Sequence, residues 1–126
     1  MPIFSSIKPS EASEEVKETF DKVEQNYGGV VPELYRQLAN SPTYLSSLTE
    51  HMGRVMAPGA VDAKTKEVVA FVVSAVNGCD YCINAHKLGL GQFGFDDEAI
   101  AELLAVAALW EEVTRFAIGA RLHWDH

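Results

Sequence analysis

The segment 67–86 is the sequence feature that most constrains the fold of this chain. It reads EVVAFVVSAVNGCDYCINAH, an apolar run that carries one acid, Glu67, and ends at Asn77-Gly78. Asn-Gly is a strong helix stop signal, yet the sequence resumes at once with Cys79-Asp-Tyr-Cys82 and reaches His86 four residues later. Because a tight turn folds two adjoining helices against each other, the segment predicts a helical hairpin.

The rest of the chain also has helical periodicity, with apolar residues at spacings of three and four and almost no alternating strand pattern. We therefore predict an all-α fold, a compact bundle of six to seven helices with the hairpin at its centre. In the first part of the chain, the expected helices are 11–26 (capped by Ser10), 32–38, 42–56 and 63–76 (capped by Asp62). The next helix should run from the cysteines through His86 and end among the glycines 89, 91 and 94. A helix capped by Asp96 should then reach at least Leu109, and 113–122 is either its kinked continuation or a seventh helix. The helix over 63–76 is apolar on most sides, so we expect it to be almost wholly buried.

Length and charge narrow the classes of function. A chain of 126 residues without a visible linker or repeat is expected to form one domain, 1–126. Its formal charge of −8 disfavours nucleic acids and anionic membranes as partners. The first residues do not resemble a signal peptide, and no apolar run approaches the ~20 residues of a membrane span. We expect a cytoplasmic protein, in which a Cys-x-x-Cys pair is typical of redox or metal chemistry.

Four residues of the hairpin could form one site. On a helix, Cys79, Cys82 and His86 lie within roughly 60° of one another around the axis. Glu67 and His86 both lie roughly 12–16 Å from the turn, on opposite arms, so they can face each other. A single acid in a valine-rich helix needs a partner, because burying an unpaired carboxylate is costly.

These residue types suit thiol redox chemistry. A helix N-terminus and a nearby imidazole both favour the reactive thiolate, so His86, one turn after Cys82, could take its proton while Glu67 orients the imidazole. Peroxide oxidises a thiolate to a sulfenic acid, which a neighbouring thiol condenses into a disulfide. We therefore predict Cys82, Cys79, His86 and Glu67 as catalytic residues, with Cys79 in the resolving role, and neither a metal nor a cofactor.

Other interpretations of the same residues remain open. Structural zinc prefers four tetrahedral ligands, whereas only the two cysteines and His86 are local here. Free cysteines are often small core residues, and an acid in the first turns of a helix is a common partner of the helix dipole. Tyr81 is expected to line the pocket. The segment His123–His126 could supply metal ligands, but we interpret it as a polar tail.

The spacing Glu67-x11-Cys79-x2-Cys82-x3-His86, with the flanking residues Asp62-Ala-Lys-Thr-Lys and Ile-Asn-Ala, resembles the alkylhydroperoxidase D-like (AhpD-like) branch of the carboxymuconolactone decarboxylase superfamily. The resemblance covers nearly the whole chain. It implies a thiol peroxidase or disulfide reductase for antioxidant defence, in which the second cysteine is peroxidatic and the first resolves. This sequence departs from the best-studied members at Tyr81, where they carry a second histidine, so their full proton relay does not carry over.

The resemblance also sets expectations for partners and alternatives. It implies a hydroperoxide substrate, a dithiol or protein disulfide reductant with a peroxiredoxin among the candidates, and a homo-trimer or homo-hexamer. An apolar fourth helix and aromatic residues in the last helices also favour a symmetric oligomer. The alternatives are a non-peroxidase redox-sensing module and a decarboxylase-like lyase. Lyase members of the superfamily generally lack the cysteine pair.

Overall fold

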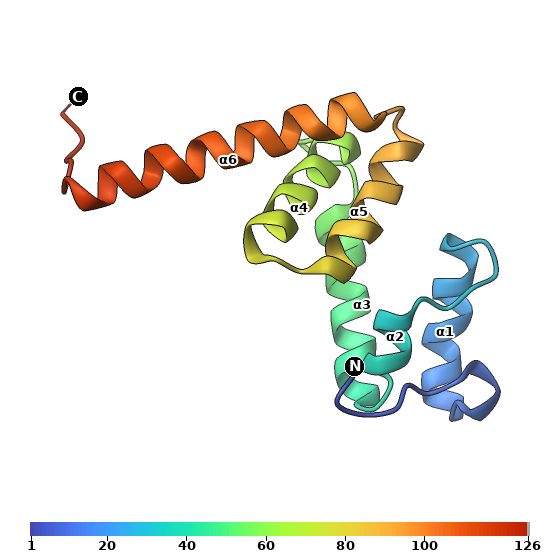
Figure 1. Ribbon diagram of the computed structural model, residues 1–126. Helices are drawn as coiled ribbons and strands as arrows, with labels where there is room; N and C mark the ends of the chain where they lie inside the picture. Colours follow the sequence, from blue (N-terminus) through green and yellow to red (C-terminus); the bar gives the residue numbers. More distant parts are fainter. Residues whose placement is uncertain (126) are drawn as a thin grey trace. The chain divides into compact units, whose positions relative to one another are not determined.

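The computed structural model describes residues 1–125 and is all-helical across them, as predicted (Figure 1). The elements are η1 (Pro9–Glu11), α1 (Glu14–Asn26), α2 (Glu33–Leu38), α3 (Pro42–Met56), α4 (Ala63–Asn77), α5 (Asp80–Gln92) and α6 (Asp97–Gly119). They form two compact units, Met1–Val55 and Met56–His126.

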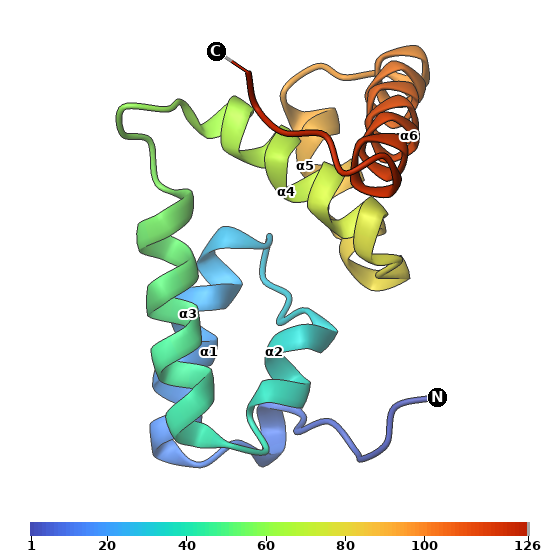
Figure 2. The same cartoon turned by 90° about the vertical axis from the view of Figure 1, so that its left-hand side faces the viewer.

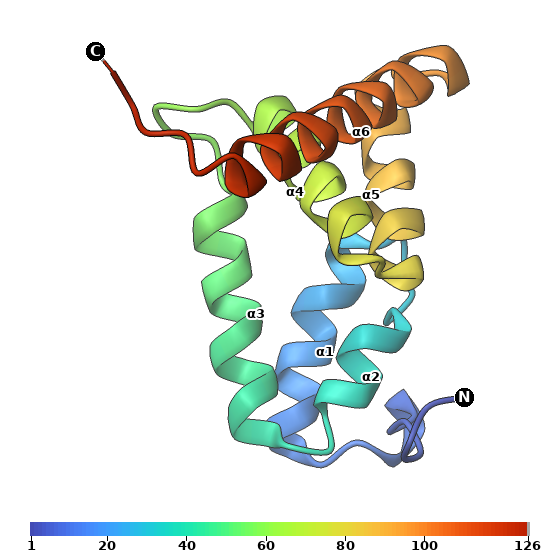
Figure 3. The same ribbon diagram turned by 60° about the vertical axis from the view of Figure 1, so that its left-hand side comes forward.

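The first unit packs α1, α2 and α3 around an apolar core (Figure 2 and Figure 3). Its buried residues are Val16, Phe20, Val23, Val31, Tyr35, Ala39 and Leu45. The predicted cap at Ser10 is wrong. The segment after Pro9 makes one 3₁₀ turn and then extends at Ala12, so α1 begins later. Ser13 caps it instead, its Oγ accepting the Val16 N–H at 3.3 Å.

The second unit is the predicted helical hairpin, α4 and α5, with α6 packed against it (Figure 1). Phe71 of α4, Leu90 of α5 and Ile100 of α6 form its buried centre. Complete burial of a side chain of this size stabilises a fold by about 1.5–3 kcal/mol. The packing of these three side chains against one another therefore holds the hairpin and α6 together. Asp62 and Asp96 cap α4 and α6 as predicted, each accepting a backbone N–H three residues on.

The prediction that α4 is almost wholly buried is wrong. Only Phe71 and Ser74 of this helix are buried, whereas Val69, Val73 and Val76 are each about half exposed. The physical reason is that α5 and α6 cover one side of α4, and the three exposed valines recur at helical spacing on another side.

α6 is one uninterrupted helix of 23 residues, so no separate seventh helix follows Trp110 within residues 1–125. No proline interrupts it, and Gly119 lies at its last position, where a glycine costs little. Ile100 and Leu103 join the core, but the second half of α6 extends beyond the hairpin (Figure 1). The apolar side chains exposed there include Leu109, Trp110, Val113, Phe116 and Ile118.

Among the helices described, none combines the length and the apolar character that crossing a membrane requires.

Candidate active site

The turn between α4 and α5 is only two residues long, and both of its backbone N–H groups donate hydrogen bonds to α4. Gly78 adopts a left-handed conformation (φ 69°), which a residue with a side chain rarely adopts. Its N–H donates to Ala75 O at 3.1 Å, and the Cys79 N–H donates to Ser74 O at 3.1 Å. These two bonds are those of a Schellman motif, which satisfies the last carbonyls of α4. Cys79 is thereby fixed at the end of one helix.

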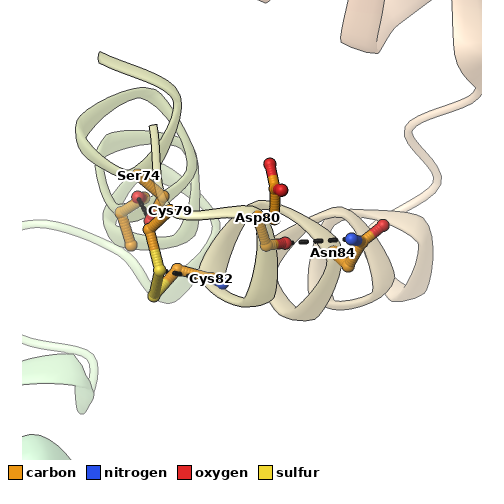
Figure 4. Close-up of a disulfide and its surroundings, with 6 residues drawn as sticks. Ser74, Cys79, Asp80, Cys82 and Asn84 are labelled. Atoms are coloured by element: carbon orange, nitrogen blue, oxygen red, sulfur yellow. Dashed lines mark hydrogen bonds between the residues drawn. A yellow bond between two sulfur atoms is a disulfide. The ribbon is translucent and has the colours of Figure 1, made fainter. Parts of the chain in front are cut away.

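Cys79 also lies directly before the first residue of the next helix, α5 (Figure 4). It is the N-cap of α5, and its Sγ accepts a hydrogen bond from the Cys82 N–H at 3.3 Å. The two cysteines form a disulfide, with their Cα atoms 5.3 Å apart. Both are half-buried at the start of a helix. A sulfur that accepts a backbone N–H at a helix N-terminus is in a position that stabilises negative charge.

Sequence reasoning missed Ser74, which supports this turn. Its side chain is buried, and its Oγ donates to Ala70 O at 2.7 Å, one turn earlier in α4. Its own carbonyl accepts the N–H of Cys79. A serine inside a run of valines is the one sequence signal that pointed to this position, because a buried hydroxyl must have a partner.

Glu67 and His86 meet across the hairpin, as the sequence predicted. Glu67 Oε1 of α4 lies 2.7 Å from His86 Nδ1 of α5. The Glu67 side chain is only 16% exposed and that of His86 30%, so the pair is partly shielded from water. Because a carboxylate accepts, Nδ1 carries the proton and Nε2 of the neutral ring is left as the acceptor.

The structure thus joins the four predicted residues in two pairs within one hairpin. Cys79, Cys82 and His86 all belong to α5 or its cap, and Glu67 of α4 contacts His86. Within residues 1–125, no hydrogen bond connects the His86 ring to either sulfur; both sulfurs are engaged in the disulfide. Any thiolate–imidazole contact therefore belongs to the reduced form.

Two other features bear on the site. Over residues 1–125, no three metal-ligating side chains come together; His126 lies outside the described residues. An open pocket on α5 contains none of the four predicted residues, and its lining includes Lys87, Leu88 and Phe95. Tyr81, predicted to line a pocket, is 43% exposed.

Comparison with known proteins places this hairpin in a family. The model of the carboxymuconolactone decarboxylase family matches residues 42–122, more than half of the chain. The alkyl hydroperoxide reductase AhpD of Mycobacterium marinum is 40% identical over 55 residues, 44% of this chain and 31% of that protein. The AhpD of Methylobacterium sp. (strain 4-46) is 36% identical over 76 residues, 60% of this chain and 43% of that protein.

A solved structure extends the comparison to the whole fold. The crystal structure of the alkylhydroperoxidase AhpD core from Rhodospirillum rubrum superimposes with a TM-score of 0.91 at 29% identity. The superposition covers 99% of this chain and 95% of that one. The alignments with the two curated relatives, by contrast, span less than half of the length of those proteins. The chain belongs to the carboxymuconolactone decarboxylase family, in the AhpD-like branch that its hairpin motif predicts.

Proposed function

We propose that this protein is a thiol-dependent peroxidase and disulfide oxidoreductase that reduces hydroperoxides through Cys79 and Cys82. The observation that carries the proposal is the Cys79–Cys82 disulfide at the start of α5, in the same hairpin as the hydrogen-bonded Glu67–His86 pair. The names of the AhpD relatives from Mycobacterium marinum and Methylobacterium support a hydroperoxide as the substrate class.

The chemistry begins from the reduced protein. The Cys82 thiolate attacks the terminal oxygen of ROOH, the O–O bond breaks, and the alkoxide leaves as ROH after taking a proton. Cys82 becomes a sulfenic acid. The thiol of Cys79 then attacks the Cys82 sulfur, the S–O bond breaks, and water leaves as the disulfide forms. The protein has lost two electrons and the peroxide has gained them.

His86 would handle the proton in this sequence. Its Nε2 is free to accept the proton of the Cys82 thiol, which lies one turn earlier on α5, and to return it to the leaving alkoxide. Glu67 holds the ring through Nδ1 and stabilises the imidazolium that forms. Tyr81 stands where the best-studied members have a second histidine, so in this chain His86 would act without that relay.

A dithiol or a protein disulfide reductant would complete the cycle by thiol–disulfide exchange, which returns both cysteines to the reduced form. A peroxiredoxin is one protein partner of suitable chemistry. This cycle requires a reducing compartment such as the cytoplasm.

The assembly proposed for the chain is a homo-trimer or homo-hexamer. The second half of α6 carries Trp110 and Phe116 with 59% and 73% of their surface exposed. Large apolar side chains left this exposed are typical of subunit interfaces, and a second copy of the chain offers a matching helix.

The decisive experiment supplies the reduced protein with an organic hydroperoxide and an excess of dithiol and follows peroxide consumption. Repeated turnover, lost in Cys82→Ser, supports the proposal. A single stoichiometric oxidation to the disulfide would instead indicate a redox sensor. Thiols that stay reduced under peroxide would contradict both and favour a lyase.

A further inference from the structure

The Glu67 carboxylate lies directly against the backbone of α5 at Gly89, one turn after His86. A Cβ added to Gly89 would collide with Glu67 Oε1 and would lie 2.9 Å from Glu67 Cδ and 3.4 Å from Glu67 Cγ. Real Cβ atoms essentially never approach other heavy atoms to under 3.0 Å. The carboxylate that holds His86 therefore occupies the space in which any other residue at 89 would have its side chain.

Backbone conformation does not explain this glycine. Gly89 lies inside α5 and is not among the residues with positive φ. Glycine is among the least favourable residues in a helix interior, so its presence there calls for a packing or functional reason. At Gly91, two residues on in the same helix, an added Cβ would meet nothing within 4 Å. The close approach at Gly89 is therefore particular to that position.

We propose that Gly89 is a positioning residue for the Glu67–His86 pair. Its missing side chain lets the carboxylate come near enough to α5 to accept the His86 Nδ1–H, and this bond keeps Nε2 unprotonated. The clash in Gly89→Ala involves the far end of a flexible side chain, so the carboxylate should move away while the helix persists. The role in proton transfer rests on the proposed function, whereas the effect on the ring does not.

The first test determines the tautomer of the His86 ring by ¹⁵N NMR of the oxidised protein. The His86 signals are assigned by their loss in His86→Gln. In the wild-type protein the neutral His86 should carry its proton on Nδ1. Gly89→Ala should shift the ring toward the Nε2–H tautomer that free imidazoles prefer, as Glu67→Ala should. The matched control, Gly91→Ala, should keep the wild-type spectrum. An unchanged tautomer in Gly89→Ala would overturn the proposal.

A double-mutant cycle keeps the proposal testable if Gly89→Ala also perturbs folding. In the Glu67→Ala protein the carboxylate is gone. Adding Gly89→Ala to it should therefore leave the His86 tautomer unchanged and should not lower the Tm. A loss of Tm that is equal in both backgrounds would contradict the proposal, because it would mean that the new methyl group collides with something other than Glu67.

Turnover with hydroperoxide and dithiol separates this inference from the proposed function. Gly89→Ala should lower the rate about as much as Glu67→Ala, and the double variant should be no slower than either. If the wild-type protein shows no turnover, the proposed function fails, but the NMR result still decides the role of Gly89. If turnover falls in Gly89→Ala while the tautomer is unchanged, the positioning role is wrong.

Discussion

Glu67 and His86 are 19 residues apart in sequence, yet their side chains lie 2.7 Å apart across the α4–α5 hairpin. A hydrogen bond to a charged group contributes about 1.5–3 kcal/mol to stability, more than a neutral bond does. It also fixes which ring nitrogen can act as a base. The pair is formed while the cysteines are oxidised, so the imidazole is already oriented when reduction releases the thiols.

Glu67→Gln should weaken catalysis without removing it. Glutamine keeps the shape of the side chain but loses the charge that stabilises the imidazolium. We expect turnover with hydroperoxide to fall by about tenfold or more, and by less than in His86→Ala, since general acid–base catalysis as a whole contributes roughly 10²–10⁴-fold. Steady-state peroxide consumption measures this. Glu102→Gln, an exposed acid of α6, is the control. Equal rates in Glu67→Gln and the wild-type protein would argue against any role of the carboxylate.

His86→Ala should make the Cys82 thiol less acidic. The helix start and the imidazole both favour the thiolate, so the midpoint of the alkylation rate against pH should lie below the ~8.5 of an ordinary cysteine. Removing the imidazole should move that midpoint upward. The measurement uses reduced Cys79→Ser protein, so that Cys82 alone reacts, with His51→Ala as the control. A midpoint that does not move would refute His86 as the base.

Asp62→Asn should change how stability depends on pH. Hydrogen bonds from the Thr65 side chain and backbone N–H hold the pKa of the Asp62 carboxyl below its ordinary value of 3.8. A lowered folded-state pKa stabilises the fold above the unfolded pKa, and this contribution is lost as pH falls through the folded value. Asparagine also caps helices but does not titrate.

The expected result is a stability advantage of the wild-type protein over Asp62→Asn that is constant near neutral pH and shrinks below about pH 4. Urea unfolding between about pH 7 and pH 2.5 measures it, with Asp21→Asn of α1 as the control. An advantage that persists undiminished at the lowest pH would mean that the charge of Asp62 is irrelevant.

Local signals let the sequence predict much of this structure. Asp62, Asp96 and Asn77-Gly78 act within a few residues, so the caps and the turn could be read from the chain alone. The Glu67–His86 contact then followed from the rise per residue on two arms of similar length.

What depended on tertiary packing could not be predicted. The exposed valines of α4 look like core in sequence, because an apolar run does not show how many neighbours a helix has. The shift of the α1 cap from Ser10 to Ser13 reflects a choice between two similar residues. In the sequence, Gly89 is only a residue that disfavours a helix, and its contact with Glu67 is visible only in three dimensions.

Light scattering should give a mass three or six times the 13.8 kDa of one chain at micromolar concentration. Phe116→Asp should shift that mass toward the monomer, because a charge would be buried in the proposed interface. The control is Glu111→Asp on the same helix. This substitution keeps the charge of the side chain and should leave the measured mass unchanged. A wild-type protein that is monomeric under these conditions would contradict the proposed assembly.

The final prediction separates the roles of the two cysteines. As the N-cap of α5, Cys79 accepts a backbone hydrogen bond and lies nearest the positive end of the helix, so the dipole alone would make it the nucleophile. His86, however, is four residues from Cys82 and seven from Cys79, which puts the base one turn from Cys82. A base that is hydrogen-bonded to a thiol favours the thiolate more than a position slightly closer to the partial positive charge of the helix N-terminus does.

We therefore expect one equivalent of hydroperoxide to leave a sulfenic acid at Cys82 in Cys79→Ser, trapped with dimedone and located by mass spectrometry. Serine is a good N-cap, so α5 should begin as before in that variant. Cys82→Ser should react with peroxide only as slowly as an ordinary thiol, because its remaining sulfur is two helical turns from the imidazole. If the adduct instead forms faster at Cys79 in Cys82→Ser than at Cys82 in Cys79→Ser, the helix terminus outweighs the imidazole, and the two roles are reversed.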